Sequence, residues 1–360
     1  MTNPLGLYLH IPFCDKKCAY CDFYSVFPIG DISSRYLKAL IKEIKKWGGI
    51  LKNRPIDTIY IGGGTPSLLG KDIITLLDAV RQNFNVLSNA EITAEANPEN
   101  TKFLDFAKKA GVNRLSVGAQ TFCDDRLSLI GRRHTAQDTK DFVKFAKEKG
   151  FNNISLDIIL GLPESDLITL NYDLEQLVAL NPQHISAYIL KKEQNTAFGK
   201  TDISVPDDDN VSNQYLKMCD VLEKAGFNHY EISNFAKNGF SSIHNTKYWL
   251  DEEYLGIGPA AHSFISGKRF FYPRDIKKFI LNPEIINDGT GGENYEKLML
   301  SLRLKSGVDL SKIYNPVPEV LKEKFIRFKN AGLMDGNFPK VHLTDRGMLL
   351  SNALILELTV

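Results

Sequence analysis

The sequence lacks long apolar runs and any large excess of charge. No segment reaches the ~18 uninterrupted apolar residues of a membrane-spanning helix. The short apolar run at 7–9 is interrupted by His10 and follows no basic stretch, so we expect no secretory signal and a cytoplasmic protein. Lys and Arg number 44 and Asp and Glu number 43, which gives a formal net charge of +1. This balance gives no reason to expect a nucleic-acid partner. Peripheral membrane contact and a homodimer stay open.

Cysteine is also scarce, and its five residues are unevenly placed. An odd number excludes a fully paired disulfide framework. Cys14, Cys18 and Cys21 lie within eight residues, whereas Cys123 and Cys219 are isolated. A tight cysteine group in a reducing compartment indicates metal or redox chemistry. We interpret the two isolated cysteines as structural, with Cys219 a small core residue on a helix face.

Short apolar segments alternate with amphipathic helical patterns up to about residue 190. Helical spacing is clear after Ser33, over 135–149 and over 167–180. Such alternation is typical of βαβ units with right-handed crossovers. The sequence therefore predicts an α/β fold, a partial (β/α)6 TIM-like barrel. Its six strands are expected at 5–10, 58–61, 91–96, 114–117, 154–158 and 184–188.

The pattern changes after the predicted barrel, which we assign to 1–205. An aromatic, loop-rich extension covers 206–290 and begins with an acidic helix cap at 207–210. The segment 295–360 predicts a small winged-helix-like module. Winged helices often bind DNA, but this segment carries ten Lys or Arg against seven Asp or Glu. That excess is small for a phosphate-binding face, so we interpret the module as structural.

Polar or glycine residues follow the predicted strands where each one ends. The carboxyl ends of parallel barrel strands meet on one face, where ligands bind. A buried carboxylate is costly unless it has a partner, so several at one edge indicate a shared site. The residues at these ends are His10, the glycines 62–64, Glu95, Gln120, Asp157 and the pair 187–188.

The spacing Cys-x3-Cys-x2-Cys places three thiols in the loop after the first strand. Three thiolates can hold three irons of a [4Fe–4S] cluster and leave the fourth iron without a protein ligand. Structural zinc is the alternative, with His10 as the fourth ligand. The residues alone leave both open.

The cysteine loop, the preceding 8–14 (Tyr-Leu-His-Ile-Pro-Phe-Cys) and Gly-Gly-Gly-Thr-Pro at 62–66 together resemble the radical S-adenosylmethionine superfamily. Within it they are most similar to the HemN/HemW group, over nearly the whole chain. The resemblance implies a [4Fe–4S] cluster on Cys14, Cys18 and Cys21, with S-adenosylmethionine bound at its open iron. The positions that it implies for contact with S-adenosylmethionine are Tyr8, Tyr20, Gly63, Gly64, Thr65, Glu95, Gln120, Arg132, Asp157 and Ala187.

Two features separate the members of this group. The dehydrogenase pattern has a fourth cysteine two residues after the third, where this sequence has Phe23. The segment 244–249 matches the HNxxYW motif associated with haem binding in the haem chaperones, which makes His244 a candidate ligand to haem iron. His262 is another possible ligand, or a partner of one, but we favour a structural histidine beside a turn.

The resemblance therefore implies a haem chaperone that delivers haem to haem-requiring, respiratory enzymes. The alternative is an anaerobic coproporphyrinogen III dehydrogenase that uses a 5′-deoxyadenosyl radical, so whether the chain is an enzyme stays open. A zinc-stabilised nucleic-acid-binding protein is the third hypothesis.

Overall fold

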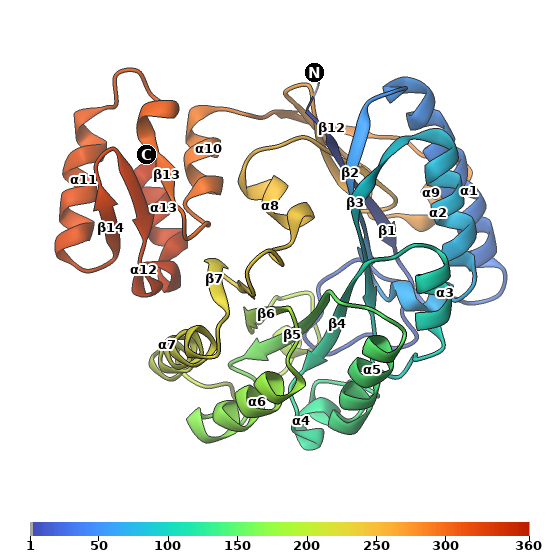
Figure 1. Cartoon of the computed structure of the whole chain (residues 1–360), viewed down its shortest axis with the longest axis horizontal. Helices are drawn as coiled ribbons and strands as arrows, with labels where there is room; N and C mark the ends of the chain where they lie inside the picture. The colour runs from blue at the N-terminus through green and yellow to red at the C-terminus, as the bar shows by residue number, and fades with distance from the viewer. Residues whose placement is uncertain (1–2, 360) are drawn as a thin grey trace.

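Six parallel strands, connected by helices, form the centre of the structure (Figure 1). The computed structural model describes residues 3–359. The six strands lie in the sheet in the order of the sequence, and this confirms the predicted α/β fold and partial barrel. They are β1 (Leu5–Ile11), β2 (Pro55–Gly63), β3 (Asn85–Ala96), β4 (Arg114–Gln120), β5 (Ile154–Leu160) and β6 (His184–Ile189).

The connecting helices cover the outer face of this sheet (Figure 1). They are α1 (Ile32–Leu51), α2 (Asp72–Asn83), α3 (Phe103–Lys109), α4 (Asp124–Leu129), α5 (Ala136–Glu148) and α6 (Leu167–Leu180). The helix α1 buries Tyr36, Leu40 and Ile44, which recur at helical spacing. Alternate strand residues such as Leu7 and Leu9 are fully buried beneath these helices. The residues between them therefore face the inside of the barrel.

The segment 206–290 extends the same sheet at both of its edges. After α7 (Asp208–Lys224), β7 (Asn228–Glu231) and β8 (Asn234–Ala236) add to β6 in antiparallel pairing. On the other side, β9 (Tyr254–Ile257) pairs in parallel with β1. The antiparallel strands β10 (His262–Ile265), β11 (Lys268–Phe271) and β12 (Ile286–Thr290) follow β9. The helix α9 (Ile276–Leu281) packs against α1. The division of the chain at 205 and 290 stays a prediction.

The helix α8 (Ile243–Trp249) lies on the concave side of the curved sheet (Figure 1). Its N-terminus is fixed by Glu91 of β3, whose carboxylate accepts hydrogen bonds from the backbone N–H groups of Ile243 and His244. A carboxylate at this end satisfies amides that have no partner within the helix. This anchor sets the direction in which the helix enters the barrel.

The C-terminal module has a three-stranded sheet of β13 (Val308–Asp309), β15 (Lys340–Leu343) and β14 (Met334–Asn337). Its helices are α10 (Asn294–Ser301), α11 (Glu319–Asn330), α12 (Asp345–Leu349) and α13 (Ser351–Thr359). Asp345 accepts a hydrogen bond from His229 Nδ1 at 3.1 Å and pairs with Lys305. The His229 bond is the main reason that the pKa of Asp345 falls to about 2. Cys219 is buried beside this cluster, as predicted.

None of the helices over residues 3–359 has the length and apolar character needed to cross a bilayer.

Candidate functional site

A cavity of about 1400 Å³ lies at the carboxyl ends of the six barrel strands. Every strand contributes an inward-pointing side chain, as expected for a shared site at this edge. One such side chain from each strand, in the order β1 to β6, is Tyr8, Tyr60, Glu95, Ser116, Asp157 and Tyr188. Tyr60 and Ser116 were not predicted. The period-two pattern of their strands would have identified them, since each lies an even number of residues from another inward position.

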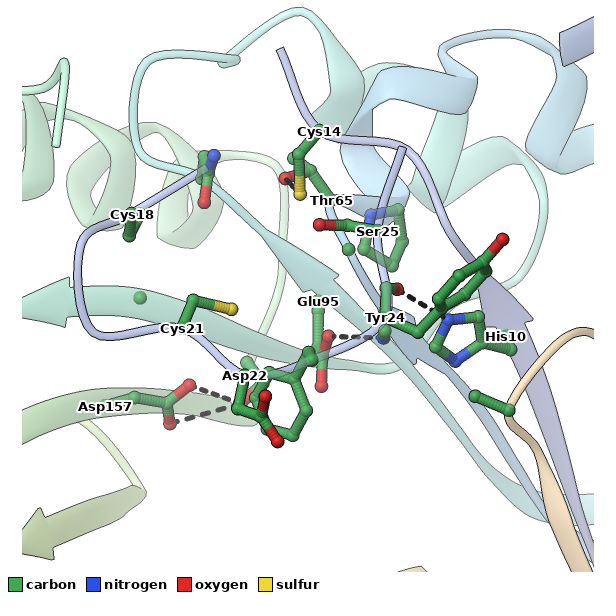
Figure 2. A pocket seen from close by; sticks show the side chains of 18 of the residues that line it. His10, Cys14, Cys18, Cys21, Asp22, Tyr24, Ser25, Thr65, Glu95 and Asp157 are labelled. Carbon is green, nitrogen blue, oxygen red and sulfur yellow. Dashed lines mark hydrogen bonds between the residues drawn. The ribbon is translucent and has the colours of Figure 1, made fainter. Parts of the chain in front are cut away.

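The three clustered cysteines lie on the loop between β1 and α1 and face this cavity (Figure 2). All three are half-buried and carry free thiols. Cys14 Sγ lies 3.5 Å from Thr65 Oγ1, and Arg132 Nη1 donates to Cys18 Sγ at 3.6 Å. Burial raises the pKa of the Cys14 and Cys21 thiols, and the neighbouring cysteines raise it further. Positively charged iron reverses this effect by stabilising the thiolates, so the donor set fits a cluster.

His10 does not complete a four-ligand zinc site. It is 4% exposed, and both of its ring nitrogens have protein partners. Nδ1 lies 3.0 Å from the Tyr8 hydroxyl and Nε2 lies 3.1 Å from the carbonyl oxygen of Tyr24. The second contact requires Nε2–H to donate, which leaves Nδ1 as the acceptor of the Tyr8 hydroxyl. Neither nitrogen is free for a metal, which removes the ligand on which the zinc alternative depends.

Two buried carboxylates, Glu95 on β3 and Asp157 on β5, form what we call the floor of the cavity (Figure 2). Glu95 accepts hydrogen bonds from the Tyr60 hydroxyl and the Gly63 N–H, both at 3.0 Å. Asp157 accepts from the Ser116 hydroxyl at 3.1 Å. Burial, and then the charge of Asp157, raises the pKa of Glu95 to about 7. Burial also raises the pKa of Asp157. The buried guanidinium group of Arg114 lowers both pKa values in part, but among residues 3–359 neither carboxylate forms an ion pair with it. Such a pair of carboxylates favours a cationic or hydroxyl-rich ligand.

The glycine turn after β2 allows the cysteine loop to approach the barrel closely. Gly63 has a φ of +119°, and a Cβ there would lie 2.6 Å from the His10 ring. A Cβ on Gly64 would lie 2.6 Å from the carbonyl oxygen of Phe13. Only glycine fits at both positions. Together with Thr65 they line the cavity beside Cys14.

The other predicted contact positions divide into two groups. Tyr20, Gln120 and Arg132 line the cavity. Arg132 is held by the Gly118 carbonyl at 2.6 Å, and Gln120 has a left-handed φ of +67° at a bulge in β4. Ala187 does not line the cavity. Its side chain is buried on the opposite face of β6, and its N–H donates to the Ser233 carbonyl.

Aromatic side chains from the extension form the other wall of the cavity. Tyr248 and Trp249 come from the end of α8, Tyr254 from β9 and Phe271 from β11. The guanidinium group of Arg303 stacks on Trp249, 4.3 Å from its ring centroid. Apolar faces with polar tips are the surface that a flat macrocycle requires. The sequence indicated Tyr248 and Trp249 through their motif but not Tyr254 or Phe271, because their strand order depends on distant pairings.

The structure places His244, the candidate haem ligand, away from the cavity lining. His244 is 1% exposed and does not line the cavity. Its Nδ1 lies 2.9 Å from Thr58 Oγ1 and its Nε2 lies 2.8 Å from the Tyr248 hydroxyl. Burial lowers the pKa of His244 to about 3, so the ring is neutral and acts as a hydrogen-bonding link. The motif thus anchors α8 to β2 and leaves its last two residues facing the cavity.

His262 also differs from its predicted role. We interpreted it as structural, but its side chain is 59% exposed and it lines the cavity. Its ring stacks on Phe271 with centroids 5.1 Å apart and an interplanar angle of 24°.

Comparison with known proteins agrees with this geometry. Residues 8–171 match the family described as the Radical SAM superfamily. The protein named heme chaperone HemW from Lactococcus lactis subsp. lactis (strain IL1403) is 33% identical over 98% of this chain and 96% of its own length. The heme chaperone HemW of Escherichia coli (strain K12) is 41% identical over 73% of this chain and 71% of its own length. The solved structure of coproporphyrinogen III oxidase (HemN) from Escherichia coli has a TM-score of 0.87 at 23% identity, covering 99% of this chain and 90% of that one.

The fold and the cysteine site are those of a radical SAM protein, as the match over 8–171 requires. A [4Fe–4S] cluster and S-adenosylmethionine follow from that superfamily. At 33% identity over almost its full length, the chain belongs to the family of the heme chaperone HemW proteins.

Proposed function

We propose that this chain binds haem in the cavity and delivers it to haem-requiring proteins such as respiratory enzymes. Cys14, Cys18 and Cys21 would hold a [4Fe–4S] cluster, with S-adenosylmethionine beside it. The names of the relatives support this proposal. The cavity supports it as well, because one of its sides carries thiols and carboxylates and the other is aromatic. A cluster held by three thiolates leaves one iron open, to which the amino and carboxylate groups of S-adenosylmethionine can bind.

The size of the cavity is the observation that carries the proposal. Its volume of about 1400 Å³ exceeds the roughly 300–1,000 Å³ of ordinary ligand pockets. One side carries thiols, glycine backbone and carboxylates, and the other side is aromatic. A single cofactor on the thiol side would leave the aromatic wall without a ligand. The space therefore favours a second, large and flat ligand beside the cofactor.

The polar side of the cavity has groups that suit S-adenosylmethionine. Glu95 and Asp157 can offset a sulfonium charge or accept from ribose hydroxyls. Arg132 is fixed in place by Gly118 and can bind a carboxylate in a bidentate manner. Gly63 and Gly64 leave room for backbone contact, and Tyr8 and Tyr20 flank the same space.

Phe23 distinguishes the proposal from the porphyrinogen alternative. It stands where the dehydrogenase pattern has its fourth cysteine, and its side chain is 69% exposed on the cavity lining. An apolar ring cannot replace a thiol as an iron ligand or as a proton or hydrogen donor. We therefore expect no oxidative decarboxylation of coproporphyrinogen III.

An anaerobic haem titration of the iron–sulfur-reconstituted protein tests the proposal. We expect saturable binding of one haem per chain, followed in the Soret band, and transfer of that haem to an apo-haemoprotein. Trp249→Leu should weaken binding about tenfold, because it removes a large flat face from the wall. Phe145→Leu is the matched control, since this exposed aromatic side chain lies on α5 outside the cavity.

Failure of the wild-type protein to bind haem, with an intact cluster, would refute the proposal. Turnover of coproporphyrinogen III with S-adenosylmethionine and a reductant would establish the alternative. Equal weakening by both substitutions would show that haem adheres nonspecifically to surface aromatics.

A further inference from the structure

Haem iron in this cavity would need a protein ligand. His244 and His262 each contact an aromatic side chain of the wall, Tyr248 and Phe271 respectively, but only one of the two is accessible. A neutral imidazole binds metal through a ring nitrogen with a free lone pair and open space in front of it. His244 meets neither condition, because Thr58 and Tyr248 occupy its two ring nitrogens and the side chain is 1% exposed. His262 is open to the cavity.

Strand register places His262 on the inner face of the barrel. Tyr8 of β1 pairs with Gly256 of β9. On the next strand, Phe264 pairs with Tyr254 in antiparallel register, so His262 lies beside Gly256. A Cβ on Gly256 would in fact lie 2.2 Å from the His262 carbonyl oxygen. Paired residues point to the same face, so Tyr8 and His262 both face the cavity.

Gly256 lies between these two side chains in the row. Tyr8 and His262 are two strand spacings apart, ~9.6 Å between backbones. The space over Gly256 is filled, because a Cβ there would also lie 3.0 Å from the Ala261 side chain. On the far side of His262, Phe271 pairs with it and stacks on its ring. The cavity wall therefore carries an imidazole that is stacked on an aromatic ring.

An acidic side chain lies near one ring nitrogen of His262. The carboxylate of Asp288 on β12 lies 3.9 Å from Nδ1, too far for a hydrogen bond but on the side that favours Nδ1–H. A carboxylate behind one nitrogen leaves the other as the metal-binding atom. Partial burial lowers the pKa of His262, Asp288 opposes this effect and Arg269 adds to it, so the net shift favours the neutral ring. Arg274, which also lines the cavity, offers a cation for the carboxylates of haem.

We infer that His262 provides the imidazole that binds haem iron at this wall, and that His244 is a positioning residue that fixes Tyr248. The inference rests on the proposed haem binding. His262 is thus the exposed histidine that binds iron, and His244 is the buried histidine that positions Tyr248.

Ferric haem titrations of the reconstituted full-length protein test the assignment, with affinity and the ligand-sensitive optical spectrum as readouts. His262→Ala should lower haem affinity about tenfold or more and remove the histidine-ligated spectrum. Added imidazole should restore that spectrum, which a merely structural role would not allow. His342→Ala, in the C-terminal module, is the matched control and should change neither readout.

His244→Ala and Tyr248→Phe should behave alike. Both break the same hydrogen bond, so each should weaken haem binding while the histidine-ligated spectrum remains. Iron and sulfide content reports whether each variant folds.

The outcomes separate the two proposals. If wild-type protein binds no haem, the proposed function and this inference both fail. If wild-type protein binds haem and His262→Ala keeps the same affinity and spectrum, the inference alone is overturned. Loss of the histidine signature in His244→Ala, but not in His262→Ala, would return the iron to His244.

Discussion

Replacing Glu95 by glutamine should remove a pH-dependent loss of stability that the cavity floor imposes on the ligand-free protein. Burial and the charge of Asp157 raise the pKa of Glu95 from 4.5 to about 7 in the folded chain. The folded state therefore holds this proton more tightly than the unfolded state. The contribution of Glu95 to stability is most favourable below pH 4.5, where both states are protonated. It falls as pH rises to about 7 and then levels off.

The size of the effect follows from the two pKa values. A difference of about 2.5 corresponds to about 3.4 kcal/mol between the two limits, at 1.36 kcal/mol for each pKa unit. About 2.5 kcal/mol of this is lost between pH 5 and pH 8. Glutamine keeps the acceptor for the Tyr60 hydroxyl but cannot ionise. Loss of the second acceptor oxygen, which binds the Gly63 N–H, lowers stability equally at every pH.

Urea unfolding of the cluster-free, full-length chain at pH 5 and pH 8 measures this difference. The free energy of unfolding of the wild type should fall between these pH values by about 2.5 kcal/mol more than that of Glu95→Gln. Glu148→Gln, at an exposed site on α5, should keep the wild-type dependence. If Glu95→Gln shows the same pH dependence as the wild type, the carboxyl at the cavity floor does not titrate as argued.

Three further predictions concern the cluster loop, the glycine turn and the C-terminal module. Cys14→Ser should abolish iron and sulfide incorporation after reconstitution, whereas Cys123→Ser should retain both; equal contents in the two variants would contradict the assigned ligand. Gly63→Ala should destabilise the protein by about 2–4 kcal/mol in thermal or urea unfolding, because φ is +119° and the new Cβ would lie 2.6 Å from a buried imidazole ring. Gly49→Ala, which meets open space within α1, is its control and should be at least as stable as the wild type, because alanine favours a helix over glycine by about 0.5–1 kcal/mol. Asp345→Asn should lower the free energy of unfolding by about 1–2 kcal/mol at pH 7. This loss should vanish as pH falls through 3.8 towards 2, since the pKa of Asp345 is lowered to about 2. A loss that persists at low pH would rule out the ion pair as its cause.

Much of the barrel and of its polar site could be predicted from the sequence because the signals are local. Alternation of apolar strands with amphipathic helices fixes the class, and the six predicted strands fall within β1 to β6, although β3 begins six residues before its predicted start. The spacing of Cys14, Cys18 and Cys21 places three thiols on one loop whatever the rest of the chain does. Glu95 and Asp157 could be predicted to share a site because the carboxyl ends of parallel strands always meet at one edge.

The roles of the histidines could not be read from their sequence neighbours. His244 stands in a polar, aromatic motif, yet its partner Thr58 is 186 residues away and their contact buries it. His262 stands beside a turn. Its exposure on the cavity wall depends on β10 lying next to β9 and on β9 lying next to β1. The local sequence pattern determines which face of the sheet a side chain lies on. The order of strands that are distant in the sequence decides whether that face packs against another element or borders the cavity. Availability of a ring nitrogen to a ligand is therefore a tertiary property.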